Sequence, residues 1–409
     1  MLEINPVIFQ LSNGVRVVYV RREAFVAHLG VMIHAGSRFE TEEEQGLAHF
    51  IEHCIFKGTE KRSALDVLTD LDSVGGELNA YTNKEEVCFH ASFRKLHFPI
   101  ACDLLSDIVI NSQFLEGELK KEKEVILDEI ISYQDNPQER IFDEFEGHLF
   151  HGHSLGYNTL GEKKTVKNLT RDSLRAYVDR YFTADRTVIS FVGDVPLDEV
   201  RDHLEKAFHS MKASKDAAEM LAPSHHMFNL NEKKANYQSH VLIGGIAPSY
   251  MHEDRRGMTL LTNMLGGPAL NSILGLLIRE QHGYAYNVEA NYTSYADTGF
   301  WNVYLGTDKK YLSKSIDLVR DQLQRLCSGG ISEADLRQGK EQLKGHIALS
   351  MDSNLELMFS LAKSMLIFNR VDGIQEIYDQ INNINSSEIG QLLNRFMNPD
   401  QLSELVFEY

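Results

Sequence analysis

The sequence predicts an α+β fold with two homologous domains, each a mainly antiparallel β-sheet packed with helices. Short apolar runs rich in β-branched residues alternate with longer segments of helical periodicity, which is typical of sheets covered by helices. The second half of the chain also repeats the order of elements found in the first half, which indicates two copies of one structural unit.

Strands are predicted in two parts of the first half. Residues 15–34 contain short alternating apolar runs with many β-branched side chains, and this composition favours strands. Residues 78–93 have the same character and are predicted as a strand or a hairpin. We expect both segments to belong to the sheet of the first domain.

Two helices are predicted in the first half. Residues 41–57 form the first, which Thr41 and Glu44 would cap and Gly58 would end. Residues 117–134 form the second, whose apolar face comprises Leu119, Ile126, Leu127, Ile130 and Ile131.

The domain boundary is predicted near residue 222. Residues 209–236 lose all periodicity and collect Lys, Ser, Asn and Pro, which is typical of a linker. We therefore expect an N-terminal domain over residues 1–221 and a homologous C-terminal domain over residues 222–409.

The internal repeat can be followed in two gapless alignments. FLEGELKKEKEVILDEI (residues 114–130) matches ISEADLRQGKEQLKGHI (residues 331–347) in its apolar positions. GLAHFIEHCIF (residues 46–56) matches GMTLLTNMLGG (residues 257–267) in the same way. Each of the two helices predicted in the first half thus has a counterpart in the second half.

Composition excludes several classes of protein. The 409 residues have a net charge of −18, which argues against nucleic acid or an anionic membrane as a partner and leaves basic peptides open. No secretory or transit peptide is recognisable and no run of 18 apolar residues occurs, so no membrane span is predicted. The four cysteines lack a disulfide-framework spacing, so the expected location is the cytoplasm.

The stretch HFIEH suggests a metal site. His49, Glu52 and His53 occupy positions i, i+3 and i+4 of the first predicted helix, so their side chains share one face. Two imidazoles at this spacing can bind one zinc ion, and a neighbouring carboxylate can take a proton from a water molecule on the metal. The alternative is a pair of structural core histidines, but each of these polar groups would need a partner when buried.

A third zinc ligand is expected from the second predicted helix. Glu122 and Glu129 are two helical turns apart on one face, and the apolar Ile130 follows Glu129. A partly buried carboxylate is a suitable zinc ligand. From the residues alone, a solvated face of Glu and Lys side chains remains an equal alternative for Glu129.

The second copy lacks the charged set. Leu260, Asn263 and Met264 stand opposite His49, Glu52 and His53, and His346 stands opposite Glu129. Since the scaffold recurs without these side chains, they are not needed for folding. We expect one zinc site per chain, in the first half.

With these motifs the chain resembles a known family, the inverted-motif zinc peptidases of the pitrilysin, insulin-degrading enzyme and mitochondrial processing peptidase group. The likeness covers most of the chain, and its length is that of the short two-domain bacterial members. The motifs that carry it are AGSRFE (35–40), GLAHFIEHCIFKGT (46–59), GGELNAYTNKE (75–85), the helix over 118–131, HSLGYNTLG (153–161), TVISFVGDV (187–195), NMLGG (263–267) and IREQHGYAYNV (278–288).

The resemblance assigns roles to five residues of the first half. It implies that His49, His53 and Glu129 bind one Zn²⁺ per chain. It implies that Glu52 is the general base and that Glu122 supports the site without binding the metal.

The resemblance also implies how substrate is held. Asn79, Ala80 and Tyr81 would lie on a strand beside the zinc that pairs with substrate backbone. Arg279 and Tyr286 match a pair that hydrogen-bonds substrate near the scissile carbonyl and helps to stabilise the tetrahedral intermediate. The expected substrate is therefore a peptide or an unfolded protein segment.

The family further implies an assembly. Its two-domain units enclose a chamber in pairs, so we expect a homodimeric clamshell in which Arg279 and Tyr286 of one chain face the zinc of the other. The main alternative is a non-catalytic family subunit that partners or supports an active peptidase. A closed structural zinc site is a weaker alternative, because Cys54 and His90 lack a spacing that would make them ligands.

Two positions depart from the family pattern. Cys54 stands where a larger apolar residue is usual, and a thiol beside zinc could make the enzyme oxidant-sensitive. Asn271 and Ser272 stand where relatives often carry Ser-Arg, which concerns a peripheral contact. The physiological substrate, the cleavage preference, a heterologous partner and the metal used in the cell are not determined by the sequence.

Overall fold

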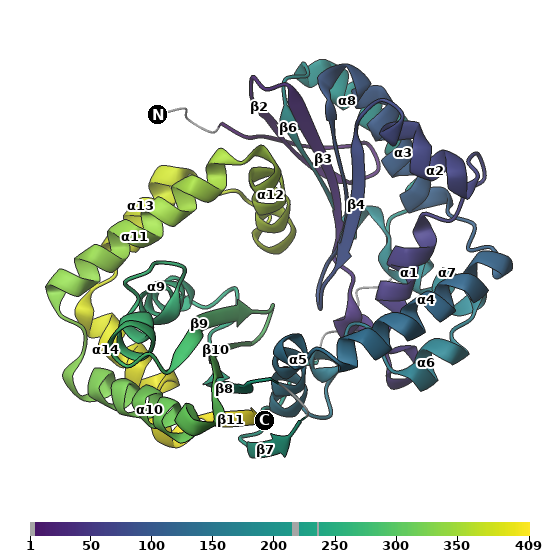
Figure 1. The fold of residues 1–409 in the computed structure, drawn as a ribbon. Helices are drawn as coiled ribbons and strands as arrows, with labels where there is room; N and C mark the ends of the chain where they lie inside the picture. Colours follow the sequence, from purple (N-terminus) through teal and green to yellow (C-terminus); the bar gives the residue numbers. More distant parts are fainter. Residues whose placement is uncertain (1–4, 215–220, 235–236) are drawn as a thin grey trace. The chain divides into compact units, whose positions relative to one another are not determined.

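The computed structural model describes residues 5–214, 221–234 and 237–409. It divides into two compact units (Figure 1). Unit 1 comprises Met1–Ile131, Tyr157–Met220 and Leu349–Gly373. Unit 2 comprises Ser132–Gly156, Leu221–Ala348 and Ile374–Tyr409.

The sheet of unit 1 has six strands in the order β1-β2-β6-β3-β5-β4. Only the β2–β6 pair is parallel, so the sheet is mainly antiparallel, as predicted. β4 is the edge strand at one end of the sheet. It pairs with β5, and Asn79 stands opposite His90 in this pair. The strands are β1 Val7–Gln10, β2 Arg16–Arg21, β3 Val26–Ile33, β4 Glu77–Thr82, β5 Val87–Arg94 and β6 Thr187–Gly193.

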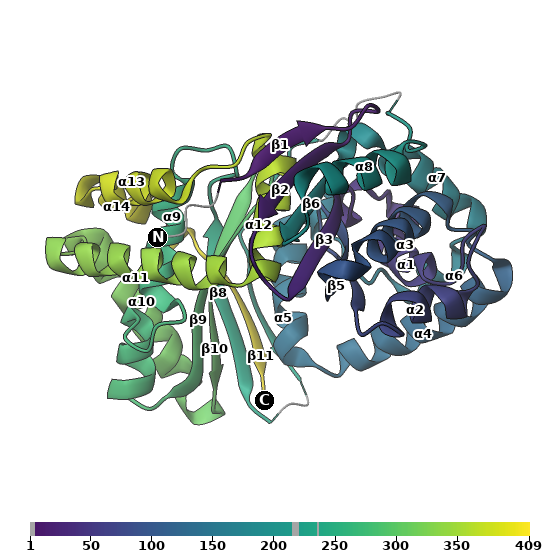
Figure 2. The same cartoon turned by 90° about the horizontal axis from the view of Figure 1, so that it is seen from above.

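Helices cover both faces of this sheet, with α12 on one face and α3 and α8 on the other (Figures 1 and 2). Along β3, Leu29 and Val31 enter the larger core, whereas Met32 packs under α12 with Met358. Burial on both faces explains why the four central strands are largely apolar, whereas the edge strands β1 and β4 are partly exposed. The helices are α1 Leu47–Ile55, α2 Ala64–Asp72, α3 Phe98–Asn111, α4 Glu116–Gln134, α6 Lys163–Asn168, α7 Arg171–Tyr181, α8 Leu197–Phe208 and α12 Asn354–Phe368.

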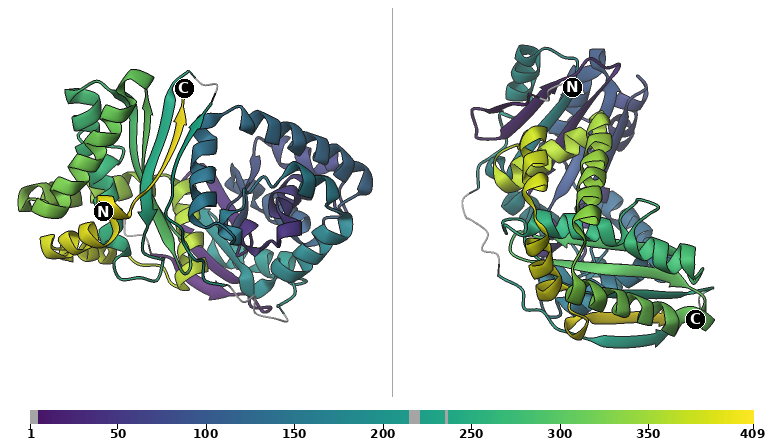
Figure 3. Two further views of the ribbon diagram at one scale, coloured as in Figure 1. Left: turned by 90° about the horizontal axis from the view of Figure 1, so that it is seen from below. Right: turned by 90° about the vertical axis from the view of Figure 1, so that its left-hand side faces the viewer.

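The sheet of unit 2 has five strands in the order β7-β11-β8-β10-β9, and only β7–β11 is parallel. Along β8, Val241 and Ile243 face the core formed with most helices, whereas Leu242 faces α5. Figure 3 shows β11, in yellow, within this sheet. The elements are α5 Pro137–Leu149, β7 Asn229–Lys233, β8 Ser239–Ile246, α9 Arg255–Gly266, a π-helix Gly275–Gln281, β9 Ala285–Ser294, β10 Gly299–Thr307, α10 Leu312–Gly329, α11 Glu333–Asp352, α13 Ile374–Asn383, α14 Ser386–Phe396 and β11 Ser403–Glu408.

The two units exchange equivalent helices. α5 follows α4 along the chain but packs within unit 2, where Phe145 contacts the core of Leu242 and Leu405. α12 follows α11, the counterpart of α4, and packs within unit 1. The continuous domains predicted over 1–221 and 222–409 therefore differ from the compact units by these exchanged segments. Side-chain periodicity cannot reveal this exchange, because an apolar helix face fits either sheet.

Two local predictions were wrong. The helix predicted from residue 41 begins at Leu47, because Gly46 adopts a left-handed conformation with φ of 89° and separates it from a short turn at Glu42–Glu44. The segment predicted as an irregular linker contains the strand β7, together with residues 215–220 and 235–236 outside the described part. β7 is an edge strand with a largely polar sequence, so it lacks the apolar alternation by which strands are recognised.

Candidate metal centre and active site

The helix α1 is held at its first turn by a buried carboxylate. Glu40 accepts hydrogen bonds from the backbone N–H groups of Gly46, at 2.9 Å, and Ala48, at 2.7 Å. These donors would otherwise be unpaired at the helix start. Burial raises the pKa of Glu40 to about 8, and the two backbone hydrogen bonds counteract this in part. Glu40 thus fixes the position of the helix that carries HFIEH.

Three side chains converge at this helix, two of them from the helix itself. His49 and His53 extend from α1, and Glu129 extends toward them from α4. Glu129 Oε2 lies 3.8 Å from His49 Nε2 and 3.6 Å from His53 Nε2. One donor atom of each residue lies within 4.8 Å of the other two. A tetrahedral zinc ion with bonds of about 2.0–2.1 Å separates its ligands by about 3.3 Å, so this group fits zinc with a small adjustment.

An unpaired polar atom of the group agrees with this fit. Glu129 Oε2, the oxygen nearest to both histidines, is buried and forms no hydrogen bond within the described structure, which is unusual for a buried polar atom. Burial, and then the neighbouring His53, lower the pKa of His49 to about 3. A neutral imidazole is the form that binds a metal.

A second group of donors in unit 2 is less suitable. Glu144, His148 and Glu232 also lie within 4.8 Å of one another. However, Arg140 forms an ion pair with Glu144 at 2.6 Å, and Lys234 forms one with Glu232 at 2.5 Å. These carboxylates already have a basic partner, whereas no Lys or Arg side chain pairs with Glu129 among the described residues.

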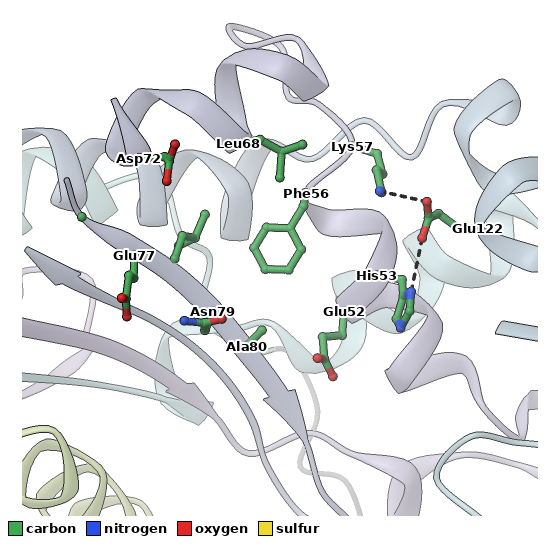
Figure 4. Close-up of a pocket in the computed structure, with 12 residues that line it drawn as sticks. Glu52, His53, Phe56, Lys57, Leu68, Asp72, Glu77, Asn79, Ala80 and Glu122 are labelled. Carbon is green, nitrogen blue, oxygen red and sulfur yellow. Dashed lines mark hydrogen bonds and ion pairs between the residues drawn. The ribbon is translucent and has the colours of Figure 1, made fainter. Parts of the chain in front are cut away.

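Glu122 orients one of the histidines. Its Oε2 lies 3.2 Å from His53 Nδ1, and its Oε1 lies 2.8 Å from Lys57 Nζ (Figure 4). A carboxylate on Nδ1 favours the tautomer whose Nε2 is free to bind a metal, and it raises the basicity of the ring. Glu122 contacts the outer side of His53 and is not one of the three converging donors.

Glu52 lies beside the donor group with a partner that the sequence analysis missed. The hydroxyl of Thr82, at the end of β4, donates to Glu52 Oε2 at 2.5 Å. Burial raises the pKa of Glu52, and the Thr82 hydrogen bond and His53 counteract it in part. A raised carboxyl pKa suits a group that accepts and then releases a proton. Thr82 lies in the motif GGELNAYTNKE (75–85), but nothing in the sequence indicates that its hydroxyl binds Glu52.

The predicted substrate strand is an edge strand. Asn79, Ala80 and Tyr81 lie on β4, which pairs only with β5 among the described strands. Asn79 is exposed, and Tyr81 contacts the ring of Phe359 on α12 at 5.7 Å between centroids. Ala80 and Asn79 both line the pocket that contains Glu52 (Figure 4). An edge strand in this position has backbone groups free to pair with an extended peptide.

The predicted pair Arg279 and Tyr286 lies in unit 2. Both line one pocket of about 720 Å³ beside β9. Tyr286 is 85% exposed, and the Arg279 guanidinium donates to Glu280 Oε1 at 2.8 Å and to the carbonyl of Leu270 at 3.3 Å. The two side chains are therefore on the surface of unit 2, where an external group can reach them.

The thiol of Cys54 is buried and is almost inaccessible to solvent. Its side chain is 2% exposed, and burial raises the pKa of the thiol well above its usual range. A protonated, buried thiol reacts slowly with oxidants. The expectation of an oxidant-sensitive thiol at this position is therefore not supported by its surroundings.

Comparison with protein families agrees with this arrangement. Residues 16–163 match the model of insulinase, peptidase family M16, and residues 168–343 match the model of the peptidase M16 inactive domain. The chain belongs to peptidase family M16. The zinc group lies in the stretch that matches the first model, and Arg279 and Tyr286 lie in the stretch that matches the second.

Its M16 relatives include proteins named as zinc proteases. An uncharacterized zinc protease of Bacillus subtilis is 35% identical over 97% of both chains. The beta subunit of the mitochondrial-processing peptidase of Bos taurus is 28% identical over 95% of this chain and 81% of its own. The match to full-length M16 relatives extends through both halves of the chain.

Solved structures share the M16 fold. A protease from Helicobacter pylori superposes with a TM-score of 0.90 at 19% identity, covering 100% of both chains. An M16-like peptidase from Alicyclobacillus acidocaldarius gives a TM-score of 0.87 at 20% identity, covering 100% of this chain and 99% of its own.

Among the described residues, no helix has the length and apolar character needed to cross a membrane.

Proposed function

We propose that this chain is a zinc-dependent metalloendopeptidase that cleaves peptides or unfolded segments. The observation that supports it most strongly is the convergence of His49, His53 and Glu129 beside Glu52. Three donors leave a fourth position of zinc open for water or substrate, as in catalytic rather than structural sites. We propose one zinc ion per chain.

Each side chain near the donor group has a separate role in the proposed reaction. Zinc held by the three donors would polarise a water molecule and lower its pKa toward about 7. Glu52 would accept a proton from that water and return it to the amine of the leaving peptide. Thr82 holds the Glu52 carboxylate in one orientation, and Glu122 holds the ring of His53.

Substrate contacts are proposed on both units. Asn79, Ala80 and Tyr81 would present the β4 edge to an extended peptide backbone. Arg279 and Tyr286 would donate hydrogen bonds near the scissile carbonyl, where negative charge develops. We propose that they act in a homodimer, from the partner chain.

The proposed setting follows from charge and family. The net charge of −18 is compatible with basic peptide substrates and unfavourable for nucleic acid or an anionic membrane. A cytoplasmic location is part of this proposal. A salt-insensitive rate on Lys- and Arg-rich peptides would contradict the preference for basic substrates.

The proposal is tested by measuring metal content and turnover of a quenched peptide library for the wild type and Glu52→Gln. We expect one zinc per chain in both proteins and cleavage by the wild type only. Zinc in both without cleavage by either would instead favour a non-catalytic M16 subunit that acts with an active partner chain.

A further inference from the structure

The exchanged helix α12 supports the end of β4 from the side opposite to Glu52. Tyr81 and Thr82 are neighbours on β4, so their side chains point to opposite faces of the sheet. Thr82 donates to Glu52, whereas Tyr81 packs against Phe359 of α12, with 5.7 Å between the ring centroids. The strand that carries the partner of Glu52 therefore lies on a helix from the second half of the chain, and both belong to unit 1.

A second contact from α12 reaches the turn that follows β4. Lys363 Nζ lies 2.8 Å from Glu86 Oε1, and the same oxygen accepts a hydrogen bond from Asn83 Nδ2 at 3.2 Å. The backbone N–H of Asn83 also donates to the carbonyl of Glu86 at 2.8 Å, which closes the turn. Because Asn83 directly follows Thr82, a displacement of this turn displaces the hydroxyl that holds Glu52.

Glu86 needs the cation of Lys363 because its own side chain is buried. Glu86 is 3% exposed, whereas the Lys363 side chain is 41% exposed. A buried carboxylate that loses its cation is unfavourable unless water or another donor reaches it. Without Lys363 the turn has to open for water to reach Glu86.

The opposite side of the turn is fixed to the segment that precedes α1. Arg38 Nη1 lies 2.6 Å from Glu85 Oε1, with both side chains buried, and the backbone N–H of Arg38 donates to a carbonyl of the turn at 2.8 Å. Glu40, two residues further along, binds the first turn of α1. The turn is thus held between the segment that positions α1 and the helix α12.

We propose that Lys363 is a positioning residue for the general base. It acts through Glu86 and the turn, keeps Thr82 at hydrogen-bond distance from Glu52, and touches neither metal nor substrate. The inference rests on the proposed peptidase function, which it deepens by giving a residue from the second half of the chain a part in orienting Glu52.

The kinetic test replaces Lys363 with methionine, which keeps a long unbranched side chain and removes the charge. In Lys363→Met we expect kcat to fall by about 3- to 10-fold with KM and zinc content little changed, because the orientation of Glu52 changes but the metal donors remain in place. Lys363→Arg restores a cation and should recover most of the activity. Lys363→Met/Glu86→Gln should recover part of it, since the buried charge that opens the turn is then absent.

Hydrogen exchange provides a second readout that does not depend on activity. Mass spectrometry of peptides covering residues 82–87 reports on opening of the turn. We expect exchange there to be about 10-fold faster in Lys363→Met than in the wild type, and to return toward the wild-type rate in Lys363→Arg.

Arg22→Met is the matched control. Arg22 also binds the start of α12, through Asn354 Oδ1 at 2.9 Å, and the carbonyl of Met351 just before it, at 3.0 Å. However, Arg22 follows β2, which three strands separate from β4. The control should lower the melting temperature but leave kcat and exchange of the turn unchanged.

The outcomes separate the positioning role from the peptidase function. Cleavage by the wild type, with unchanged turn exchange or unchanged kcat in Lys363→Met, would refute the inference and leave the peptidase function standing. An equal fall of kcat in Arg22→Met, or no recovery in Lys363→Arg, would also overturn it. If the wild type cleaves no peptide, the peptidase function fails, and the exchange rates alone decide whether Lys363 holds the turn.

Discussion

At the residue scale, the two ring nitrogens of His53 have different neighbours. Nδ1 lies against Glu122 and Nε2 points to Glu129, so the imidazole has only one orientation that satisfies both sides. The carboxylate of Glu52 is likewise held, by Thr82. The site therefore depends on residues that bind neither metal nor substrate.

Removal of the Glu122 carboxylate should weaken zinc binding. In Glu122→Gln the amide cannot supply the negative charge beside Nδ1, so we expect zinc affinity to fall by about 10- to 100-fold. Competition with a metal chelator measures the change. Glu118→Gln, on the same helix but paired with Lys121, should bind zinc like the wild type, and equal affinities for both variants would contradict the role of Glu122.

Thr82 should affect turnover more than substrate binding. In Thr82→Val the shape is kept but the hydrogen bond to Glu52 is lost, so we expect kcat to fall by about 10-fold with KM little changed. Thr82→Ser retains the hydroxyl and should recover most of the activity. Steady-state kinetics, with zinc content measured in the same samples, test this expectation. If Thr82→Ser does not recover activity, the role of Thr82 is packing only.

His34 should make unit 1 less stable in acid. Burial, and then Arg186, Arg38 and Arg16, lower the pKa of His34 to about 4. The unfolded chain, with a histidine pKa near 6.5, binds the proton first, so this contribution is complete above about pH 6.5 and is lost as the pH falls toward 4. The loss amounts to about 3 kcal/mol.

Denaturant titrations between pH 7 and pH 4 test this expectation. In His34→Gln the titrating group is absent, so the decrease in unfolding free energy over this range should be smaller than in the wild type. An identical pH dependence in both proteins would assign the acid sensitivity to other groups.

At the element scale, the position of α1 depends on the loop before it. Gly46 adopts φ of 89°, and a Cβ there would lie 2.7 Å from the carbonyl oxygen of Leu160. The same residue supplies one of the N–H groups that Glu40 binds. The start of the zinc-motif helix is thus set by a glycine and a buried carboxylate together.

A side chain at Gly46 should displace this helix. Gly46→Ala adds the strain of a left-handed alanine, about 1–2 kcal/mol, to a contact with backbone that cannot move aside cheaply. We expect a lower melting temperature and weaker zinc binding. Gly117→Ala, in α4 with nothing within 4 Å of the added Cβ, should be neutral or stabilising. Comparable losses in both variants would count against the explanation.

At the scale of the whole molecule, the duplicated unit has the His–His–Glu group in only one of its two copies. His346 on α11 takes the place of Glu129, but in unit 2 it bonds Asn263 at 3.1 Å instead of approaching a pair of histidines. The second unit carries Arg279 and Tyr286 beside β9. In the proposed function, a complete site uses residues of both kinds of unit.

The proposed homodimer predicts complementation between inactive chains. Glu52→Gln and Arg279→Ala should each have little activity alone. When the subunits are exchanged without unfolding, about half of the dimers are mixed. Each mixed dimer has one intact site of two, so about a quarter of wild-type activity should return. Size-exclusion chromatography establishes the dimer, and a mixture as inactive as its components would contradict a site completed by the partner.

The sequence by itself determined the fold class, the repeat and the converging residues on α1. Their spacing alone places His49, Glu52 and His53 on one helix face, since helical geometry is local. It did not determine that Glu129 meets them or that Ile131, predicted on the apolar face of α4, is 47% exposed, because both depend on how α4 packs. The Thr82 hydrogen bond and the exchange of α5 and α12 were decided only by the tertiary structure, because each joins groups far apart in the chain.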